Sequence, residues 1–274
     1  MSRLRFTRPG PPSGDELLRT LVSLTDEVLD GIKVHQARVE LATALQRLML
    51  PAALPDFPGV RACARYAPAR RGLEVGGDWY DAFSTAEGRV GIAIGDVQGH
   101  DAEAAAFVGP VRTGLRAVAG GASADPGAVL ARVNDLLVSL GAALFVTCSF
   151  VRFDPSNGEL AVARAGHVPA VWAAADGRSE IVWDEGGLPL GMFAGEEYPV
   201  TYRRLVPPAA VALLTDGVVE GPRYPIDRGL EAVARLVGTG FDADPELLAT
   251  EVIRVAELTG HDDDAAVVVI RYDG

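Results

Sequence analysis

Apolar residues recur every three or four positions over residues 15–50, which predicts one long amphipathic helix. The recurring positions are Leu17, Leu18, Leu21, Leu24, Val28, Leu29, Ile32, Val39, Leu41, Leu45, Leu48 and Met49. Prolines within residues 1–14 favour an irregular leader, and Pro51 and Pro55 end the helical pattern. Such a helix buries its apolar stripe either on its own domain or on a second molecule, as a signalling or dimerising helix.

From residue 58 onward, short apolar runs predict strands interspersed with helices. The predicted strands cover 60–66, 89–95, 144–153, 159–164, 168–174, 179–183, 200–205, 210–215 and 265–272. The predicted helices cover 101–118, 126–140, 229–237 and 245–259. Turn signals at 155–158 and 176–177 join neighbouring strands as hairpins. Hairpin-linked strands with helices gathered in two places favour an antiparallel α+β layered fold over a doubly wound one.

The composition narrows the class of protein. The 274 residues suffice for a sizeable core, and 37 acidic against 25 basic residues give a formal net charge of -12. Such a chain repels nucleic acid and anionic membranes, so we expect neither as a partner. Cys63 and Cys148 are too few for a disulfide framework. No apolar run reaches the roughly 20 residues of a membrane span and none reads as a signal peptide, which predicts a cytoplasmic protein.

Aspartates adjoin three strongly apolar predicted strands. Asp96 follows the strand at 89–95, Asp216 follows the strand at 210–215, and Asp262, Asp263 and Asp264 precede the last strand. If the last strand runs antiparallel to the other two, we expect all these carboxylates to meet at one edge of one sheet. Asp78, in the run GGDWYD at 76–81, is a fourth candidate.

Converging carboxylates require a positive partner. Two full charges about 5 Å apart repel by roughly 3 kcal/mol at an effective dielectric constant of about 20. Carboxylate and carbonyl oxygens suit Mg²⁺ or Mn²⁺, and no His or Cys spacing indicates zinc. Any one of these aspartates alone is more typical of a turn or a helix cap, but four together favour a metal site. Such a site, without an activated Ser or Cys, favours hydrolysis of a phosphoester by water.

Six short motifs occur in an order that resembles the SpoIIE/RsbU branch of the metal-dependent PPM phosphatases, which are similar to protein phosphatase 2C. They are EVGGDWYD at 74–81, GDVQGH at 95–100, AGH at 165–167, GLPLG at 187–191, TDGVVE at 215–220 and DD at 263–264. The resemblance runs from about Leu45 to the C-terminus. It implies a phosphatase domain over 51–274, preceded by a leader at 1–14 and a helical segment at 15–50.

The resemblance also implies a fold and a set of ligands. The expected fold is a four-layer α/β/β/α sandwich around two antiparallel sheets, with two Mn²⁺ or Mg²⁺ ions bound. Asp96 would bridge the two ions, and the Val97 carbonyl would bind one of them. Asp216 and Asp263 would hold the other, and Asp78 would contact an ion directly or through water. Asp264 would lie just behind these ligands.

Departures from the family pattern concern the residues around the second motif. Asp101 stands where family members usually have Gly, and is either a helix cap or an extra charge near the metals. The phosphate-binding arginine of eukaryotic relatives has no clear counterpart. Arg70 and Arg71 are the nearest candidates, but their setting is more typical of solvated loop residues. His100 is a candidate general acid beside the catalytic Asp96. We expect His167 to be structural.

The resemblance implies a serine/threonine phosphatase acting on a phosphorylated anti-anti-sigma (STAS) protein in a partner-switching pathway. Two alternatives stay open, which are a catalytically weak regulatory module of the same fold and a phosphatase of small phosphomonoesters. Dimerisation through the helix at 15–50 is a further expectation, because the helices that follow Asp96 could transmit its movement to the site.

Overall fold

The computed structural model describes residues 14–68, 76–99, 102–121, 125–141, 144–260 and 263–274. Within them, two five-stranded sheets stack face to face, and every strand pairing is antiparallel. Sheet A has the order β1 (Val60–Ala67), β10 (Ala265–Tyr272), β9 (Ala209–Leu214), β6 (Val171–Ala174) and β7 (Ser179–Ile181). Sheet B has the order β2 (Asp78–Ser84), β3 (Val90–Val97), β4 (Val146–Asp154), β5 (Glu159–Ala165) and β8 (Val200–Arg204).

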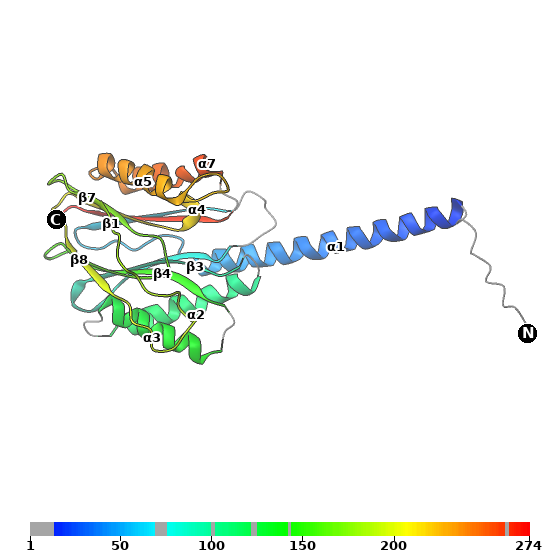
Figure 1. The fold of residues 1–274 in the computed structure, drawn as a ribbon, viewed down its shortest axis with the longest axis horizontal. Helices are drawn as coiled ribbons and strands as arrows, with labels where there is room; N and C mark the ends of the chain where they lie inside the picture. Colours follow the sequence, from blue (N-terminus) through cyan, green and yellow to red (C-terminus); the bar gives the residue numbers. More distant parts are fainter. Residues whose placement is uncertain (1–13, 69–75, 100–101, 122–124, 142–143, 261–262) are drawn as a thin grey trace, which may run out of the picture.

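Helices cover the outer face of each sheet (Figure 1). Sheet B carries α2 (Ala102–Ala119) and α3 (Pro126–Ser139), and η1 (Ala86–Gly88) lies between β2 and β3. Sheet A carries α4 (Asp216–Val219), α5 (Ile226–Gly240), α6 (Pro245–Ile253) and α7 (Val255–Thr259). The predicted four-layer α/β/β/α sandwich is therefore confirmed.

Successive side chains of a β-strand point to opposite faces of its sheet, which explains how β10 contributes to two hydrophobic cores. Val268 and Ile270 point into the core between the sheets, whereas Val267 and Val269 pack under α5 and α6. All four are buried, which is why the segment reads as a continuous apolar run rather than an alternating one.

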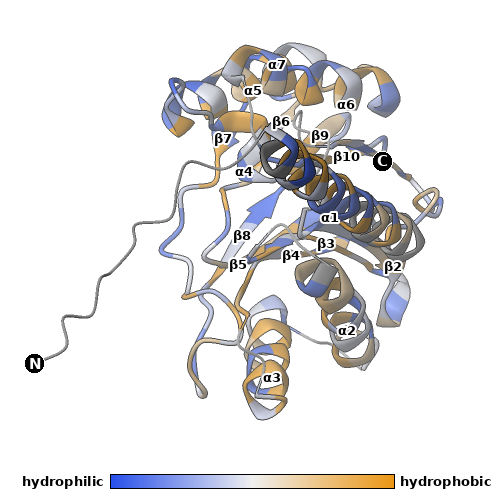
Figure 2. Cartoon of the chain, turned by 90° about the vertical axis from the view of Figure 1, so that its right-hand side faces the viewer, coloured by the Kyte–Doolittle hydropathy of each residue, from blue (hydrophilic) through white to orange (hydrophobic). Residues whose placement is uncertain are grey.

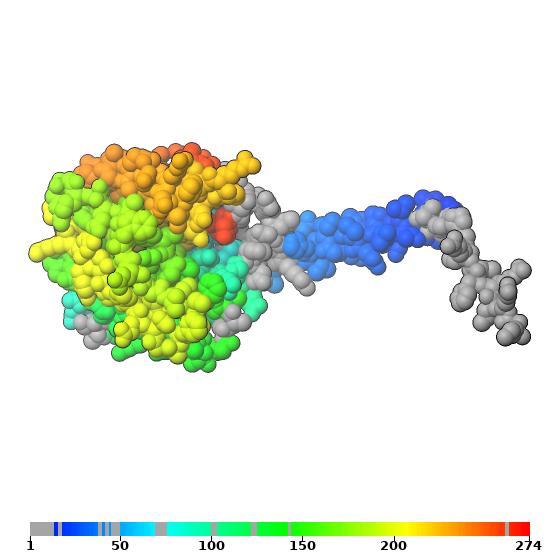
Figure 3. Space-filling model, viewed as in Figure 1, coloured from blue at the N-terminus to red at the C-terminus, as the bar shows by residue number. Residues whose placement is uncertain are grey.

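Helix α1 (Gly14–Met49) projects from the sandwich as one long rod, and Gly31 does not interrupt it (Figures 1 and 3). Only its C-terminal part contacts the domain, against α2. The apolar side chains of its projecting part are exposed, among them Leu21, Leu24 and Val28. Among the described helices none combines the length and the hydropathy that crossing a bilayer demands.

Two sequence expectations are wrong in detail. The aspartate-bearing strands do not share a sheet, because β3 belongs to sheet B whereas β9 and β10 belong to sheet A. The carboxylates therefore approach one another across the sandwich, not along one sheet edge. The predicted helix at 245–259 is two helices, α6 and α7, which meet at Arg254.

An ion pair between a buried aspartate and two arginines holds α2 on sheet B. Asp81 of β2 is almost fully buried and accepts two hydrogen bonds from Arg116, from Nε to Oδ2 and from Nη2 to Oδ1, both of 2.6 Å. Arg112 lies 3.3 Å from Oδ2 of the same carboxylate. The Arg116 guanidinium also lies 5.1 Å from the centroid of the Phe83 ring. Helix α2 is thus fixed to the strand that begins with Asp78.

We expect Asp81→Asn to lower the free energy of unfolding by about 3 kcal/mol, because it leaves two guanidinium groups without their buried counter-charge. Urea denaturation measures this. The matched control is Asp176→Asn, which removes an exposed pair with Arg178 and should cost less than about 1 kcal/mol. Equal losses in the two variants would contradict the special role of Asp81.

Candidate metal centre

The register of sheet B brings two of the predicted ligands together. Asp78, the first residue of β2, lies directly opposite Asp96 near the end of β3. Asp78 is buried, with 3% of its surface exposed, and Asp96 is half-buried. Opposed residues of an antiparallel pair have Cα atoms about 5 Å apart, so these two carboxyl groups occupy one small region.

The other two predicted ligands come from the matching end of sheet A. Strand β9 ends at Leu214, and α4 begins two residues later at Asp216. Asp263 precedes β10, the antiparallel neighbour of β9, so the two aspartates lie side by side. A Cβ on Gly217 would stand 2.0 Å from the Asp264 carbonyl oxygen, so only glycine allows this approach.

Thr215 joins the two sheets at this point. Its hydroxyl donates to Oδ2 of Asp78 over 2.8 Å and accepts from the Ala266 N–H over 2.8 Å. The threonine is fully buried. The hydrogen bond therefore fixes the Asp78 carboxylate of sheet B against the strand ends of sheet A. It also supplies a hydrogen-bond donor to a carboxylate that burial shields from solvent.

Gly77 brings a backbone carbonyl to the same place. A Cβ on this residue would lie 2.1 Å from the Val97 carbonyl oxygen and 2.8 Å from Oδ1 of Asp96. The Val97 N–H donates to the Gly77 carbonyl over 3.1 Å. The Val97 carbonyl and the Asp96 carboxylate thus face the same glycine, as a shared ligand pair requires.

The aspartates perturb one another strongly. Burial, and then the charge of Asp96, raises the pKa of Asp78 well above its ordinary value. Burial, followed by the charges of Asp216 and Asp263, raises the pKa of Asp96 from 3.8 to about 8. Asp216 reaches solvent on one side, yet surrounding protein and the charge of Asp263 raise its pKa as well. These carboxyl groups are therefore close, and they are unfavourable as a set of bare anions.

Asp264 lies behind this group. It is buried, and its Oδ2 accepts a hydrogen bond from the Tyr66 hydroxyl of β1. Its charge contributes to the raised pKa of both Asp78 and Asp96. The sequence analysis assigned no role to Tyr66 or to Thr215. Thr215 lies inside the motif TDGVVE, directly before Asp216, and this position was the available signal of its role.

The environment of His167 is that of a structural residue, as expected from the sequence. It is buried, and its Nδ1 lies 2.8 Å from the Thr147 hydroxyl, while burial lowers its pKa to about 3. It is thus neutral and tied to β4. His100, Asp101, Arg70, Arg71 and Asp262 lie outside the described residues.

The chemistry of the available donor atoms indicates which metal ion would fit this site. In the part of the chain with described positions, no three His, Cys, Asp or Glu side chains form a ready-made ligand group. The available donors are carboxylate oxygens and the Val97 carbonyl, which suit a hard divalent ion and not zinc or copper. Burial and neighbouring carboxylates raise the pKa of Asp78, Asp96 and Asp216, and a divalent cation would relieve this repulsion, so the donors fit Mg²⁺ or Mn²⁺.

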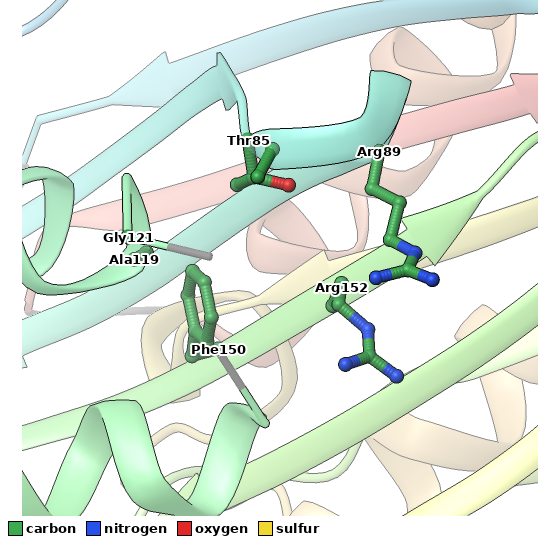
Figure 4. A pocket seen from close by; sticks show the side chains of 7 residues that line it. Thr85, Arg89, Ala119, Gly121, Phe150 and Arg152 are labelled. Atoms are coloured by element: carbon green, nitrogen blue, oxygen red, sulfur yellow. The ribbon is translucent and has the colours of Figure 1, made fainter. Parts of the chain in front are cut away.

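A small pocket elsewhere in sheet B is not a rival site. It lies at the far end of β2 and β3 and is lined by Thr85, Arg89, Phe150 and Arg152 among others (Figure 4). It has room for little more than a water molecule. Both arginines are already paired, Arg89 with Asp154 and Arg152 with Glu159.

Two packed antiparallel sheets, flanked by helices and carrying aspartates at a common end, define the class of PP2C-type protein phosphatase domains. Residues 86–273 match the family model described as Stage II sporulation protein E (SpoIIE). The chain therefore belongs to the SpoIIE family.

Individual relatives agree with this assignment. The chain is 29% identical over 275 residues to Protein IcfG of Synechocystis sp., an alignment that covers 90% of this chain and 42% of that protein. The RsbU and RsbW domains of Rv1364c from Mycobacterium tuberculosis superpose with a TM-score of 0.73 at 28% identity, covering 82% of this chain and 63% of that one. The SiaA PP2C domain of Pseudomonas aeruginosa has a TM-score of 0.68 at 22% identity, covering 89% and 99%. This chain thus spans less than half of IcfG.

In protein treated with EDTA, we expect Asp96→Asn to raise the thermal midpoint, because it removes one of the repelling carboxylates. A raised carboxyl pKa favours the folded state at low pH, and this contribution is lost as pH rises from about 4 through about 8. The gain of the variant over the unchanged protein should therefore increase between pH 5 and pH 8. Thermal melts at several pH values measure it.

The exposed Asp242 provides the control, since Asp242→Asn should leave the midpoint unchanged at every pH. A lower midpoint for Asp96→Asn at pH 8 would show that the carboxylates do not repel one another in the folded chain.

Proposed function

We propose that this protein is a metal-dependent serine/threonine protein phosphatase. The observation that carries the proposal is the meeting of Asp78 and Asp96 from sheet B with Asp216 and Asp263 from sheet A, in a domain of the SpoIIE family. Burial and neighbouring carboxylates raise the pKa of Asp96 and Asp216, which supports the binding of cations by this group. The substrate would be phosphoserine or phosphothreonine on another protein.

We assign two Mn²⁺ or Mg²⁺ ions to this group. Asp96 would contact both, with the Val97 carbonyl on one and Asp216 and Asp263 on the other, while Asp78 would bind directly or through water. Two solved structures with the same fold support the choice of ion. The catalytic domain of PstP holds two manganese ions, and RsbX holds magnesium, at 16% and 12% identity to this chain.

Bound divalent ions supply Lewis acidity and lower the pKa of a coordinated water. The protein's own residues hold and orient the carboxylates of the site. Thr215 holds the buried Asp78, and Tyr66 holds Asp264, so the inner side of the site is rigid. Asp216 and Asp263 reach solvent, so the outer side is where a phosphoryl group carried by a protein can enter.

The reaction exchanges one P–O bond for another. Water attacks phosphorus, the bond to the serine or threonine oxygen breaks, and the products are inorganic phosphate and a hydroxyl side chain. The leaving oxygen needs a proton, and we assign its delivery to His100, which follows β3 by three residues, because histidine is the side chain that most often serves as a general acid in enzymes. No group of the protein is phosphorylated on the way.

We further propose that the substrate is a phosphorylated STAS-type anti-anti-sigma protein in a partner-switching pathway, in the cytoplasm. The resemblance of the motifs to the SpoIIE/RsbU branch supports this. So does the solved structure of Rv1364c, in which an RsbU domain and an RsbW domain occur together.

Purified protein should hydrolyse p-nitrophenyl phosphate with Mn²⁺ or Mg²⁺ and lose this activity in EDTA. Asp96→Asn should reduce kcat at least a hundredfold while circular dichroism shows an unchanged fold. Asp242→Asn is the matched control and should keep full activity. Metal-independent turnover, or full activity in Asp96→Asn, would contradict the proposed enzyme.

Two further measurements on the purified protein distinguish the remaining alternatives. Calorimetric titration with Mn²⁺ should show binding, whereas a regulatory module without catalysis would show neither binding nor turnover. A phosphorylated STAS protein should inhibit p-nitrophenyl phosphate hydrolysis competitively at lower concentration than phosphoserine or sugar phosphates do. The reverse order would indicate a phosphatase of small phosphoesters.

We also propose that α1 forms a homodimer with a second copy of itself. Its exposed apolar side chains recur at helical spacing along the part that projects beyond the domain. These positions are Leu18, Leu21, Leu24, Val28, Leu29 and Ile32. A stripe of this length is typical of two-helix packing. Because α1 contacts α2, and α2 is fixed to Asp81, dimerisation could alter the position of the metal ligands.

Light scattering should show a dimer for the full chain and a monomer for Leu21→Glu/Val28→Glu, because burying two carboxylates in a helical seam is unfavourable. The control Leu258→Glu places the same charge on the exposed surface of α7 and should leave the dimer intact. A monomeric unchanged protein would refute the proposal.

A further inference from the structure

His167 lies in the segment that crosses from sheet B to sheet A beside the candidate metal centre. It follows Gly166, after β5 of sheet B, and precedes β6 of sheet A. Val171 of β6 pairs with Ala212 of β9, so the segment before β6 runs alongside the end of β9 towards Asp216. Figure 2 looks onto the end of the molecule from which α1 projects, with sheet A above sheet B. His167 is therefore close to the sheet A side of the centre.

The imidazole of His167 contacts sheet B next to Asp96. Its Nδ1 lies 2.8 Å from the hydroxyl of Thr147 on β4. Thr147 is the register partner of Asp96, so their Cα atoms are about 5 Å apart. Both side chains share the face of sheet B that carries Ile94 into the core between the sheets. Cross-strand partners of this kind interact directly, so the Thr147 hydroxyl has two alternative acceptors, the imidazole and the Asp96 carboxylate.

Backbone contacts fix the position of the imidazole. Gly166 has a φ of +62°, in the region that favours glycine, and its N–H donates to the Gly187 carbonyl over 2.7 Å. Arg164 donates from Nη1 to the His167 carbonyl over 2.6 Å and pairs with the Asp184 carboxylate over 2.6 Å. The ring is thus held against Thr147 by a buried and fully connected piece of backbone.

The neighbours of the ring decide which nitrogen carries its proton. Burial lowers the pKa of His167 to about 3, and the nearby Leu214 backbone opposes this shift as a carbonyl acceptor does. Nε2 forms no hydrogen bond of ordinary geometry with a described residue, so its contact with Leu214 is weak. A proton on Nε2 is nevertheless favoured, because a proton on Nδ1 would leave the Nε2 lone pair facing that carbonyl. Nδ1 is then the acceptor, and the Thr147 hydroxyl donates to it.

Asp78 and Asp96 differ in their hydrogen bonds as a consequence. Thr215 donates to Asp78 over 2.8 Å. Among the residues that the structure describes, none donates to Asp96, whose pKa responds only to burial and neighbouring carboxylates. A carboxylate that contacts two ions does so through its two oxygens. The Thr147 hydrogen, held by the imidazole, leaves both oxygens of Asp96 free.

We infer that His167 is a positioning residue of the phosphatase site, which holds the Thr147 hydroxyl and so keeps both oxygens of Asp96 available to divalent ions. Without the imidazole, the hydroxyl would donate to Asp96 and turn its carboxylate towards β4, away from the ligands of sheet A. The inference rests on the proposed function, in which Asp96 contacts both ions. In this role His167 touches neither the ions nor the substrate.

Calorimetric titration with Mn²⁺ tests the inference on the full chain and three variants. His167→Phe frees the hydroxyl and should raise the Kd for Mn²⁺ about tenfold or more, as the loss of an outer partner of a metal ligand does. Thr147→Val removes the hydroxyl and should change the Kd less than about threefold. The double variant His167→Phe/Thr147→Val should return to within about threefold of the unchanged protein, because no hydroxyl remains to occupy Asp96.

Further variants separate this role from a general loss of stability. His167→Gln offers an amide oxygen to the Thr147 hydroxyl and should keep the Kd close to that of the unchanged protein. Tyr272→Phe is the matched control, since it removes a hydroxyl that donates to the Pro155 carbonyl near the opposite end of β10, and it should not change the Kd. Thermal melts in EDTA verify that each variant is folded, and His167→Leu replaces His167→Phe if the latter is not.

The pattern of Kd values and turnover distinguishes this inference from the proposed function. A double variant whose Kd stays as high as that of His167→Phe would overturn the inference, and so would an unchanged Kd in His167→Phe. In both cases retained hydrolysis of p-nitrophenyl phosphate would leave the proposed function standing. The expected Kd values without any turnover would support the positioning role and refute the proposed function. Absence of Mn²⁺ binding to the unchanged protein would overturn both.

Discussion

Repulsion among carboxylates at the shared end of the two sheets is the constraint on which the rest of the site depends. Asp78 and Asp96 come from sheet B and Asp216 and Asp263 from sheet A, so closing the sandwich brings the charges together. The apolar core between the sheets supplies the opposing driving force. The Thr215 hydroxyl offsets part of the repulsion by donating to Asp78, and divalent cations would offset the remainder. We expect folding and metal binding to be coupled for this reason.

The same strand connects the site to the projecting helix. Asp78 begins β2, and Asp81, three residues later, is the buried anchor of α2. Helix α1 contacts α2 and otherwise projects from the domain. The contacts between α1 and α2, the ion pair at Asp81 and the short piece of strand from Asp81 to Asp78 thus connect the projecting helix to the site.

Most elements of the fold could be predicted from the sequence, because the apolar runs of β3, β9 and β10 and the hairpin turns are local signals. The distribution of strands between two sheets could not, since it depends on contacts between distant segments. This is why Asp96 was expected in the same sheet as Asp216. Thr215 and Tyr66 were missed for a similar reason, as their partners lie 137 and 198 residues away in the chain.

A centre built from the proposed ligands, four aspartates and one carbonyl, would recognise little beyond a phosphoryl group, because its contacts would be oxygen ligands and water rather than a shaped pocket. Selectivity among phosphoproteins must then come from surface outside it. The loop between β7 and β8 meets sheet B through the pairing of Leu190 with Val146 and through the backbone hydrogen bonds of Gly187 with Arg164 and Gly166. Asn134 of α3 fixes the backbone of Gly191 and Phe193 in the same loop. The proposed ligands are thus constrained by charge, whereas this loop is constrained by packing and hydrogen bonds.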